Sequence, residues 1–187
     1  SAAHDIEGPT RHPAVARPVV SKVTMAGNDA GFQTVERTAN GTVVVHYEFT
    51  DRGRGPKLEA TYRLNEEGLP VAVEVSGNEY MKAAVAERFA LDAGRARWTN
   101  RGEQGEIAGT AVGGAFYSSY DGVPEEAALL ANALLRAPGR RLALLPAGAA
   151  SAEVVATRNA TSAAGQPAPI RLVKIPALTF PPSYLCL

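Results

Sequence analysis

Cysteine and histidine are scarce in this chain. Its 187 residues include one cysteine, Cys186, and three histidines, His4, His12 and His46. One thiol can form neither an internal disulfide nor a cysteine-rich zinc site. A zinc site needs three or four protein ligands, and the histidines do not stand in any recognisable ligand spacing. The sequence therefore predicts no metal site in this chain.

The chain also lacks a net charge and long apolar runs. Lys+Arg and Asp+Glu each number 19, so the formal net charge is zero. A dedicated nucleic-acid-binding protein needs a surplus of cations to replace counterions, so no nucleic-acid partner is expected. No apolar run approaches the roughly 18–20 residues that a membrane helix needs. We therefore expect no membrane span.

Apolar residues are abundant enough for one core. They make up 45% of the chain, and the length suits a single domain. Residues 1–18 are polar and contain proline, which is typical of a flexible arm. The sequence thus predicts an N-terminal arm over 1–18 and one antiparallel β domain with one helix over 19–187.

Alternation of apolar and polar residues predicts the strands. Val43, Val45 and Tyr47 alternate with more polar positions, and a period of two indicates a strand with one buried face. Asn40-Gly41 precedes this segment and is a hairpin signal, because a type I′ turn needs positive φ at both residues. Similar segments and turn signals recur along the chain, and they predict about nine or ten short strands.

One segment, "VPEEAALLANALLRAPG", has a helical pattern instead. Pro124 suits a first helical turn, and Glu125 and Glu126 favour the positive end of the helix dipole. The "APG" at 137–139 ends the pattern. The expected fold is therefore mostly β (α+β): a curved antiparallel sheet or half-barrel packed on one main helix at about 124–137.

The loop "TDRGRGPKL" at 50–58 is rich in glycine and basic residues. Walker and dinucleotide-binding loops open a helix, whereas strand patterns flank this segment on both sides. We interpret it as a hairpin connection. If Arg52, Arg54 and Lys57 have a specific role, we expect docking against another domain, and alanine at Arg52 and Arg54 should leave folding nearly unchanged.

Two groups of residues offer alternative functions. His46 and Glu48 share a strand face, as residues i and i+2 must, and with Asp51 they are the catalytic candidates of a small open-barrel enzyme. Alternatively, Leu130 and Leu134 of the expected helix line the cavity of a stand-alone periplasmic half-barrel that binds a lipid or acyl ligand. The plainer interpretation of these leucines is core packing.

Four segments together carry a family resemblance. They are "HYEFTDRGRGPKLEATYRLNEEGLPVAVEVSGNEYMKAAVAERF", "ARWTNRGEQGE", "AFYSSYDGVPEEAALLANALLR" and "LALLPAG". Over roughly residues 30–187 the chain resembles the region that precedes the catalytic barrel in some exported bacterial amidohydrolases. In that family a His-x-His on the first barrel strand begins the set of metal ligands, and this chain contains no His-x-His.

The resemblance implies a role without catalysis. The chain would be an accessory or interaction domain, the front part of a larger exported metal-dependent amidohydrolase. Zinc would be held only in a downstream catalytic barrel, and that barrel or another subunit would be the partner. The resemblance also implies a periplasmic or secreted bacterial protein with its signal peptide removed, and the start "SAAHDIEG" fits either such processing or a cloning remnant.

Overall fold

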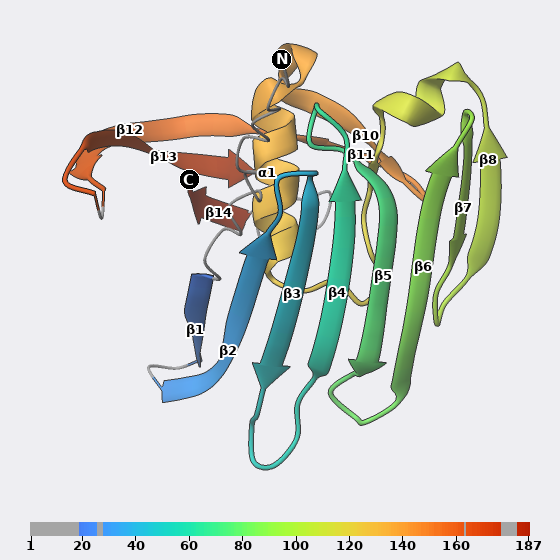
Figure 1. Ribbon diagram of the computed structural model, residues 1–187, viewed down its shortest axis with the longest axis horizontal. Helices are drawn as coiled ribbons and strands as arrows, with labels where there is room; N and C mark the ends of the chain where they lie inside the picture. Colours follow the sequence, from blue (N-terminus) through green and yellow to red (C-terminus); the bar gives the residue numbers. More distant parts are fainter. Residues whose placement is uncertain (1–18, 26–27, 163, 177–182) are drawn as a thin grey trace, which may run out of the picture.

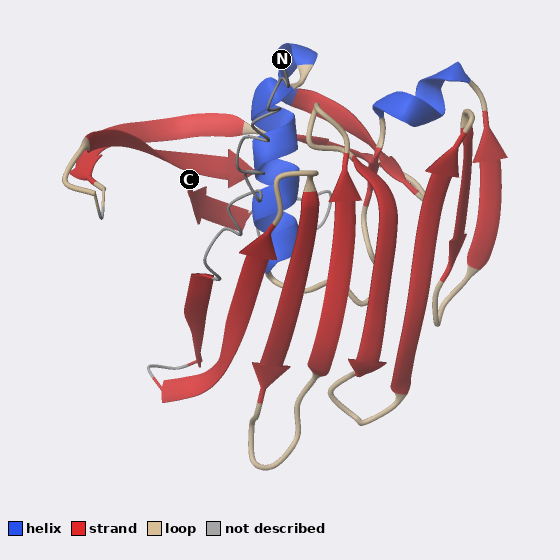
Figure 2. Cartoon of the chain, viewed as in Figure 1, coloured by secondary structure: helices blue, strands red, loops and turns tan. Residues whose placement is uncertain are grey.

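Strands make up most of this computed structural model, with one α-helix among them (Figure 1, Figure 2). The structure describes residues 19–25, 28–162, 164–176 and 183–187. The predicted arm over 1–18 lies outside the described residues. The predicted class, mostly β with one antiparallel sheet and one main helix, is confirmed.

Eight strands form one large antiparallel sheet in which neighbours in the sequence are neighbours in space. Its two edge strands do not pair with each other, so the sheet is open and curved, not a closed barrel (Figure 1). The strands are β1 (Val19–Met25), β2 (Asn28–Arg37), β3 (Thr42–Phe49), β4 (Lys57–Leu64), β5 (Pro70–Asn78), β6 (Ala84–Asp92), β7 (Arg95–Thr99) and β8 (Gln104–Ala108).

Two small sheets complete the described chain. One contains β11 (Ala149–Ser151), β10 (Arg141–Leu145) and β9 (Phe116–Tyr117), and the other contains β12 (Glu153–Thr161), β13 (Pro167–Ile175) and β14 (Ser183–Cys186). Two 3₁₀ turns lie at Thr110–Gly114 and Pro138–Arg140. The prediction of nine or ten strands was too low, because a strand as short as β11 arises from pairing with β10 and has no alternation of its own.

The inner face of the large sheet and the helix α1 (Glu125–Arg136) share one core. Val45 of β3 lies opposite Ala60 of β4, and both are fully buried. Leu134 of α1 is also fully buried in this core. Burying a valine or leucine side chain stabilises the fold by about 1.5–3 kcal/mol. The alternation that predicted the strands therefore selects the face that packs on the helix.

The N-terminus of α1 is fixed by β2. The N-cap residue, Pro124, makes no side-chain hydrogen bond to the first turn of the helix. The buried Gln33 supplies its Oε1 atom instead, which accepts a hydrogen bond of 2.8 Å from the Glu125 N–H. Arg37 forms an ion pair with the Glu125 carboxylate. An otherwise unsatisfied helix N–H is thus satisfied by the sheet, which sets where the helix begins against it.

The turn between β2 and β3 differs from the prediction. Positive φ occurs at Gly41 (81°) and not at Asn40, so the expected two-residue type I′ turn was wrong. The Gly41 N–H donates to the Thr38 carbonyl at 3.2 Å, and the Thr38 N–H donates to the Thr42 carbonyl at 2.9 Å. The connection is therefore a longer turn in which glycine alone supplies the left-handed residue.

Candidate functional site

Four connections meet at one end of the large sheet, and we call them the loop end. They are the β3–β4 loop (50–56), the β5–β6 loop (79–83), the β7–β8 loop (100–103) and the segment from β9 to α1 (118–124). Tyr80 Oη donates to Asp51 Oδ2 at 3.4 Å, and Asn78 Nδ2 donates to the Gly55 carbonyl at 3.4 Å. These contacts hold the first two loops side by side.

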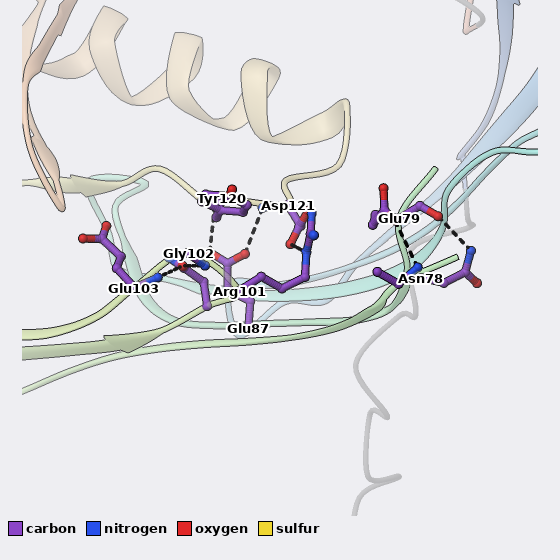
Figure 3. Close-up of polar contacts among 10 residues, drawn as sticks. Asn78, Glu79, Glu87, Arg101, Gly102, Glu103, Tyr120 and Asp121 are labelled. Atoms are coloured by element: carbon purple, nitrogen blue, oxygen red, sulfur yellow. Dashed lines mark hydrogen bonds and ion pairs between the residues drawn. The ribbon is translucent and has the colours of Figure 1, made fainter. Parts of the chain in front are cut away.

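Glu87 fixes the segment from β9 to α1 on the sheet. It lies on β6, faces the helix and is 1% exposed. Its carboxylate accepts hydrogen bonds from the Tyr120 N–H at 2.8 Å and from the Asp121 N–H at 3.0 Å (Figure 3). It also accepts one from Tyr117 Oη at 2.7 Å. A buried carboxylate is tolerated only when such donors replace its water. The position of Tyr120 and Asp121 is therefore set from inside the protein.

Glu126 is a second anchor for the same segment. Its carboxylate accepts hydrogen bonds from Tyr62 Oη at 2.7 Å and from the Ser119 N–H at 2.8 Å. Burial raises the pKa of Glu126, because a low-dielectric environment disfavours the charged form. Burial, together with the adjacent Glu126 carboxylate, also raises the pKa of Tyr62. Helix, sheet and loop end are thus joined by one acidic side chain.

Arg101 connects the β7–β8 loop to this segment. Its Nε and Nη2 atoms donate to Asp121 Oδ2 and Oδ1 at 2.8 and 2.7 Å (Figure 3), and this pairing raises the pKa of Arg101. The guanidinium carbon lies 5.5 Å from the centre of the Tyr120 ring, a cation–π distance. A Cβ on Gly102 would lie 2.6 Å from that ring, so glycine is needed here for Tyr120 to pack.

The surface of the loop end combines cations with large apolar side chains. Besides Arg101, the exposed cations are Arg52, Arg54 and Lys82, and the exposed apolar side chains are Tyr80, Met81 and Tyr120. Within the described part of the chain, none of the three cations forms an ion pair. Tyrosine, methionine and arginine are the residues enriched where proteins bind one another. The loop end therefore has the composition of an interface.

The acidic residues of the loop end are mostly occupied within it. Asp51 accepts from Tyr80, and Asp121 is paired with Arg101. Glu79 accepts the Ala83 N–H at 3.0 Å, and backbone N–H groups lower the pKa of its carboxyl. Glu103 is the exposed exception. These hydrogen bonds do not remove the carboxylate charges, and the loop end holds four acidic and four basic residues. A binding partner would therefore meet positive charge mainly at the hairpin tips that carry Arg52, Arg54 and Lys82.

Two of the three predicted docking residues lie at this surface. Arg52 and Arg54 are exposed at the tip of the β3–β4 hairpin, which a bridge between Asp51 and Arg54 closes. Lys57 instead lies in β4, where its Nζ is 3.8 Å from Glu48 Oε2 of the neighbouring strand. The positive tip therefore consists of the two arginines.

His46 and Glu48, the catalytic candidates, lie on the outer face of the large sheet. His46 Nδ1 is 3.8 Å from Glu59 Oε2, so each candidate is paired with a cross-strand neighbour and not with the other. Both line an open groove of about 570 Å³, and Asp51 is not among its lining residues. The structure brings the two residues to one groove but leaves His46 exposed to solvent.

Leu130 and Leu134, the candidates for ligand binding, pack in the interior. Leu134 is fully buried, and Leu130 is half-buried against the same core. One cavity at the helix has a volume of about 270 Å³ and is lined by Leu69, Ala133 and Leu142 among others. Neither candidate leucine lines it. Their position follows the plainer interpretation, in which the apolar stripe of α1 forms the core.

The described residues contain no group of three His, Cys, Asp or Glu side chains that could hold a metal ion. His4 and His12 lie outside them.

None of the described helices has the length and apolar character to cross a membrane. No protein-family model, curated protein or solved structure matches this chain.

Sequence reasoning missed Glu87, although a signal for it was present. In β6 the inward positions read Val85, Glu87 and Phe89, and a carboxylate at a core position of an alternating strand indicates a buried polar contact. Tyr80, Met81 and Tyr120 were missed for another reason. Their exposure depends on how four loops converge, which local patterns do not determine.

Proposed function

We propose that this chain is a non-catalytic interaction domain that docks on a partner protein through its loop end. The observation that carries the proposal is the exposed cations of the loop end, which lie beside exposed tyrosine and methionine side chains on an internally anchored base. The proposed partner is the catalytic barrel of an exported metal-dependent amidohydrolase, in the same protein or in another subunit. That part of the proposal rests on the resemblance over residues 30–187.

The anchoring of the loop end favours binding. Binding loses affinity when side chains and loops must be ordered at the moment of association. Here Glu87 and Glu126 order the segment that carries Tyr120 and Asp121 in the free protein. Arg101 then holds the Tyr120 ring from the neighbouring loop. The interface would therefore be largely formed before the partner arrives.

Backbone conformation at two hairpin tips supports the same function. Arg52 has a φ of 51° and Lys82 has a φ of 67°, in the left-handed region where glycine is favoured. Strain of this kind is most often retained where the side chain is used. Ala93 and Arg140 have φ of 47° and 51° outside the loop end, so this conformation alone does not mark a docking residue. At Arg52 and Lys82 it places a cation at the surface of the loop end, and for that position we assign them the same role in docking.

The chemistry of the loop end defines the matching surface. The partner would present carboxylates toward Arg52, Arg54 and Lys82, and an apolar recess for Met81, which is 65% exposed. Complementary charge speeds association and sets orientation, and added salt weakens it. We therefore expect association to be fastest at low ionic strength.

Charge reversal at the loop end tests the proposal. The partner for the experiment is the segment encoded next to this chain, expressed separately, in which we expect a barrel with a His-x-His. The triple variant Arg52→Glu, Arg54→Glu, Lys82→Glu should bind it at least about tenfold more weakly, since each lost charge contact in an interface costs about 1 kcal/mol or more. Calorimetric titration at two salt concentrations measures this.

A matched control has the same change in charge elsewhere. Arg63→Glu, Arg140→Glu and Arg141→Glu alter three cations that are exposed but lie outside the loop end. This variant should bind like the wild type. Equal loss of binding in both triple variants, or a neighbouring segment without metal ligands, would contradict the proposal.

Activity of the isolated chain separates the alternatives. The purified 187-residue protein should hydrolyse no amide substrate. Turnover that disappears on adding a chelator would refute the non-catalytic role. Turnover that disappears in His46→Gln would favour an open-barrel enzyme, and uptake of a fluorescent fatty acid by delipidated protein would favour a lipid-binding module.

A further inference from the structure

The hairpin of β12 and β13 extends away from the helix and the large sheet (Figure 1). From Val155 to Asn159 every residue of β12 is exposed, and so are Pro169 to Arg171 in β13. Side chains on both faces of the ribbon therefore meet solvent. An isolated two-stranded ribbon is marginally stable in water, so this part of the hairpin would gain stability from a further strand.

The outer edge of β13 is closed to such a strand. The Arg171 N–H donates to the Leu187 carbonyl at 2.8 Å, and the Leu187 N–H donates back at 2.9 Å. Because the groups of a strand alternate in direction, those of Pro169 and Pro167 point to the same side as those of Arg171. Proline has no N–H to donate and guards an exposed edge. The part of the β13 edge that contains Pro167 and Pro169 therefore offers no regular ladder of hydrogen bonds to a further strand.

The outer edge of β12 is open. Thr157 lies opposite Arg171, whose backbone groups face β14, so the N–H and C=O of Thr157 also point away from β13. By the same alternation Asn159 and Thr161 point outward, and all three are exposed. β12 is the edge strand of its sheet in the described chain. It contains no proline or lysine, and its charged side chains are Glu153 at its start and Arg158.

We propose that β12 pairs antiparallel with β12 of a second copy of this chain, about a two-fold axis at Asn159. Thr157 then lies opposite the partner's Thr161, and Asn159 lies opposite the partner's Asn159. The backbone N–H groups of the three outward residues of each strand donate hydrogen bonds to the other strand, and their C=O groups accept hydrogen bonds from it. Two three-stranded sheets become one six-stranded sheet, and the pairing closes on itself, as an isologous interface must.

Charge and regularity select this register. In it Arg158 lies opposite the small side chain of the partner's Ala160. An axis at Arg158 would place two guanidinium groups directly opposite each other, which is destabilising. An axis at Thr157 would bring in Val155, where the register of β12 shifts. An axis at Ala160 would pair fewer residues. The edge therefore accommodates its own copy without opposing like charges.

A cysteine cross-link tests the register. In the background Cys186→Ser, Asn159→Cys should form a disulfide-linked dimer on mild oxidation, because facing residues of a hydrogen-bonded pair have Cα atoms about 5.5 Å apart. Ala156→Cys is the matched control on the same exposed strand. In the proposed register it lies six positions from the partner's Ala156, about 20 Å away, and should not cross-link.

A proline variant tests the association itself. Thr157→Pro removes an outward N–H that bonds to no described residue, so the variant should fold like the wild type, with the same far-ultraviolet circular dichroism. Sedimentation velocity should show a concentration-dependent dimer for the wild type and a monomer for the variant. The interface is small, so we expect a weak dimer.

Two outcomes overturn the inference. One is a wild type that stays monomeric at the highest soluble concentration, and the other is equal cross-linking by Asn159→Cys and Ala156→Cys. The loop-end charge variant should still dimerise, since it leaves β12 intact. Failure of this inference is therefore distinguishable from failure of the proposed docking role.

Discussion

At the scale of single residues, two acidic side chains have the largest structural effect. Glu87 and Glu126 together accept five hydrogen bonds, from Tyr117, Tyr62 and three backbone N–H groups. A donor left unpaired in the interior costs the full free energy of its desolvation. The two carboxylates therefore stabilise the fold and the loop end at once.

Replacement of Glu87 tests this at the first carboxylate. Glu87→Ala strands three donors beneath the loop end and should lower the free energy of unfolding by about 3 kcal/mol or more. Glu87→Gln keeps one acceptor oxygen and should cost clearly less. Urea denaturation of both variants measures the difference. Equal losses, or a loss below about 1 kcal/mol in the alanine variant, would show that Glu87 is not the anchor.

The pH dependence of stability tests Glu126. Burial raises the pKa of this carboxyl in the folded state above its usual value of 4.5. Its contribution to stability is then fully present below the usual value and is lost as pH rises through the raised pKa. Glu126→Gln does not titrate, so raising the pH from acid to neutral should shift the free energy of unfolding in favour of the variant. Urea denaturation at several pH values checks this, and a constant difference would contradict it.

At the scale of elements, the hairpins combine regularly alternating strands with tips of unfavourable backbone conformation. Alternation in β3 to β6 produces the buried face, and the tips of the β3–β4 and β5–β6 hairpins depart from favourable geometry at Arg52 and Lys82. A strained tip lowers the free energy of unfolding, and the burial of the strands' inner face compensates for this loss. Ala93, at the tip of the β6–β7 hairpin, has a φ of 47° as well, so positive φ follows from the tight turns and its link to docking at Arg52 and Lys82 is part of the proposal.

Glycine at a hairpin tip should relieve its strain. Arg52→Gly removes the steric cost of the left-handed backbone and should raise the free energy of unfolding by up to about 1 kcal/mol. Arg52→Ala keeps that backbone and, as expected from the sequence, should leave folding nearly unchanged. Thermal and urea unfolding compare the two variants. A destabilised glycine variant would mean that the Arg52 side chain makes a contact that stabilises the fold.

The sequence predicted elements better than their assembly. Period two located β3, β4 and β5 of the large sheet, and Pro124 with its following glutamates located α1, because these signals are local. The strand β8 was missed, and so was β11, which exists only by pairing with β10. The turn at Asn40-Gly41 was placed correctly but assigned the wrong type, because the flanking backbone decides which residue takes positive φ.

The candidate site was predictable only in part. The loop with Arg52 and Arg54 was recognised from glycine and basic residues within one segment. Its neighbours Tyr80 and Tyr120 come from segments about 30 and 70 residues further along the chain. Glu87 and Glu126 position the segment of Tyr120, and Tyr80 is bonded to Asp51. Of these long-range contacts, the sequence contains a sign only of the first, the glutamate at an inward position of β6.

At the scale of the whole molecule, charge is balanced overall and uneven locally. The net charge is zero, and the loop end itself holds four acidic and four basic residues. Asp121 is paired with Arg101 and two further carboxylates accept hydrogen bonds, while three of the cations, at the hairpin tips, are free of ion pairs within the described chain. Association through this surface should therefore slow as salt is added, although the protein as a whole carries no net charge.

Amide hydrogen exchange tests the proposed docking most directly. The chain would be compared alone and in complex with the separately expressed segment encoded next to it. The account predicts slower exchange at residues 50–56 and 79–83 in the complex, and little change at the exposed tip of the β12–β13 hairpin. Unchanged exchange in both loops of a formed complex would contradict docking through the loop end.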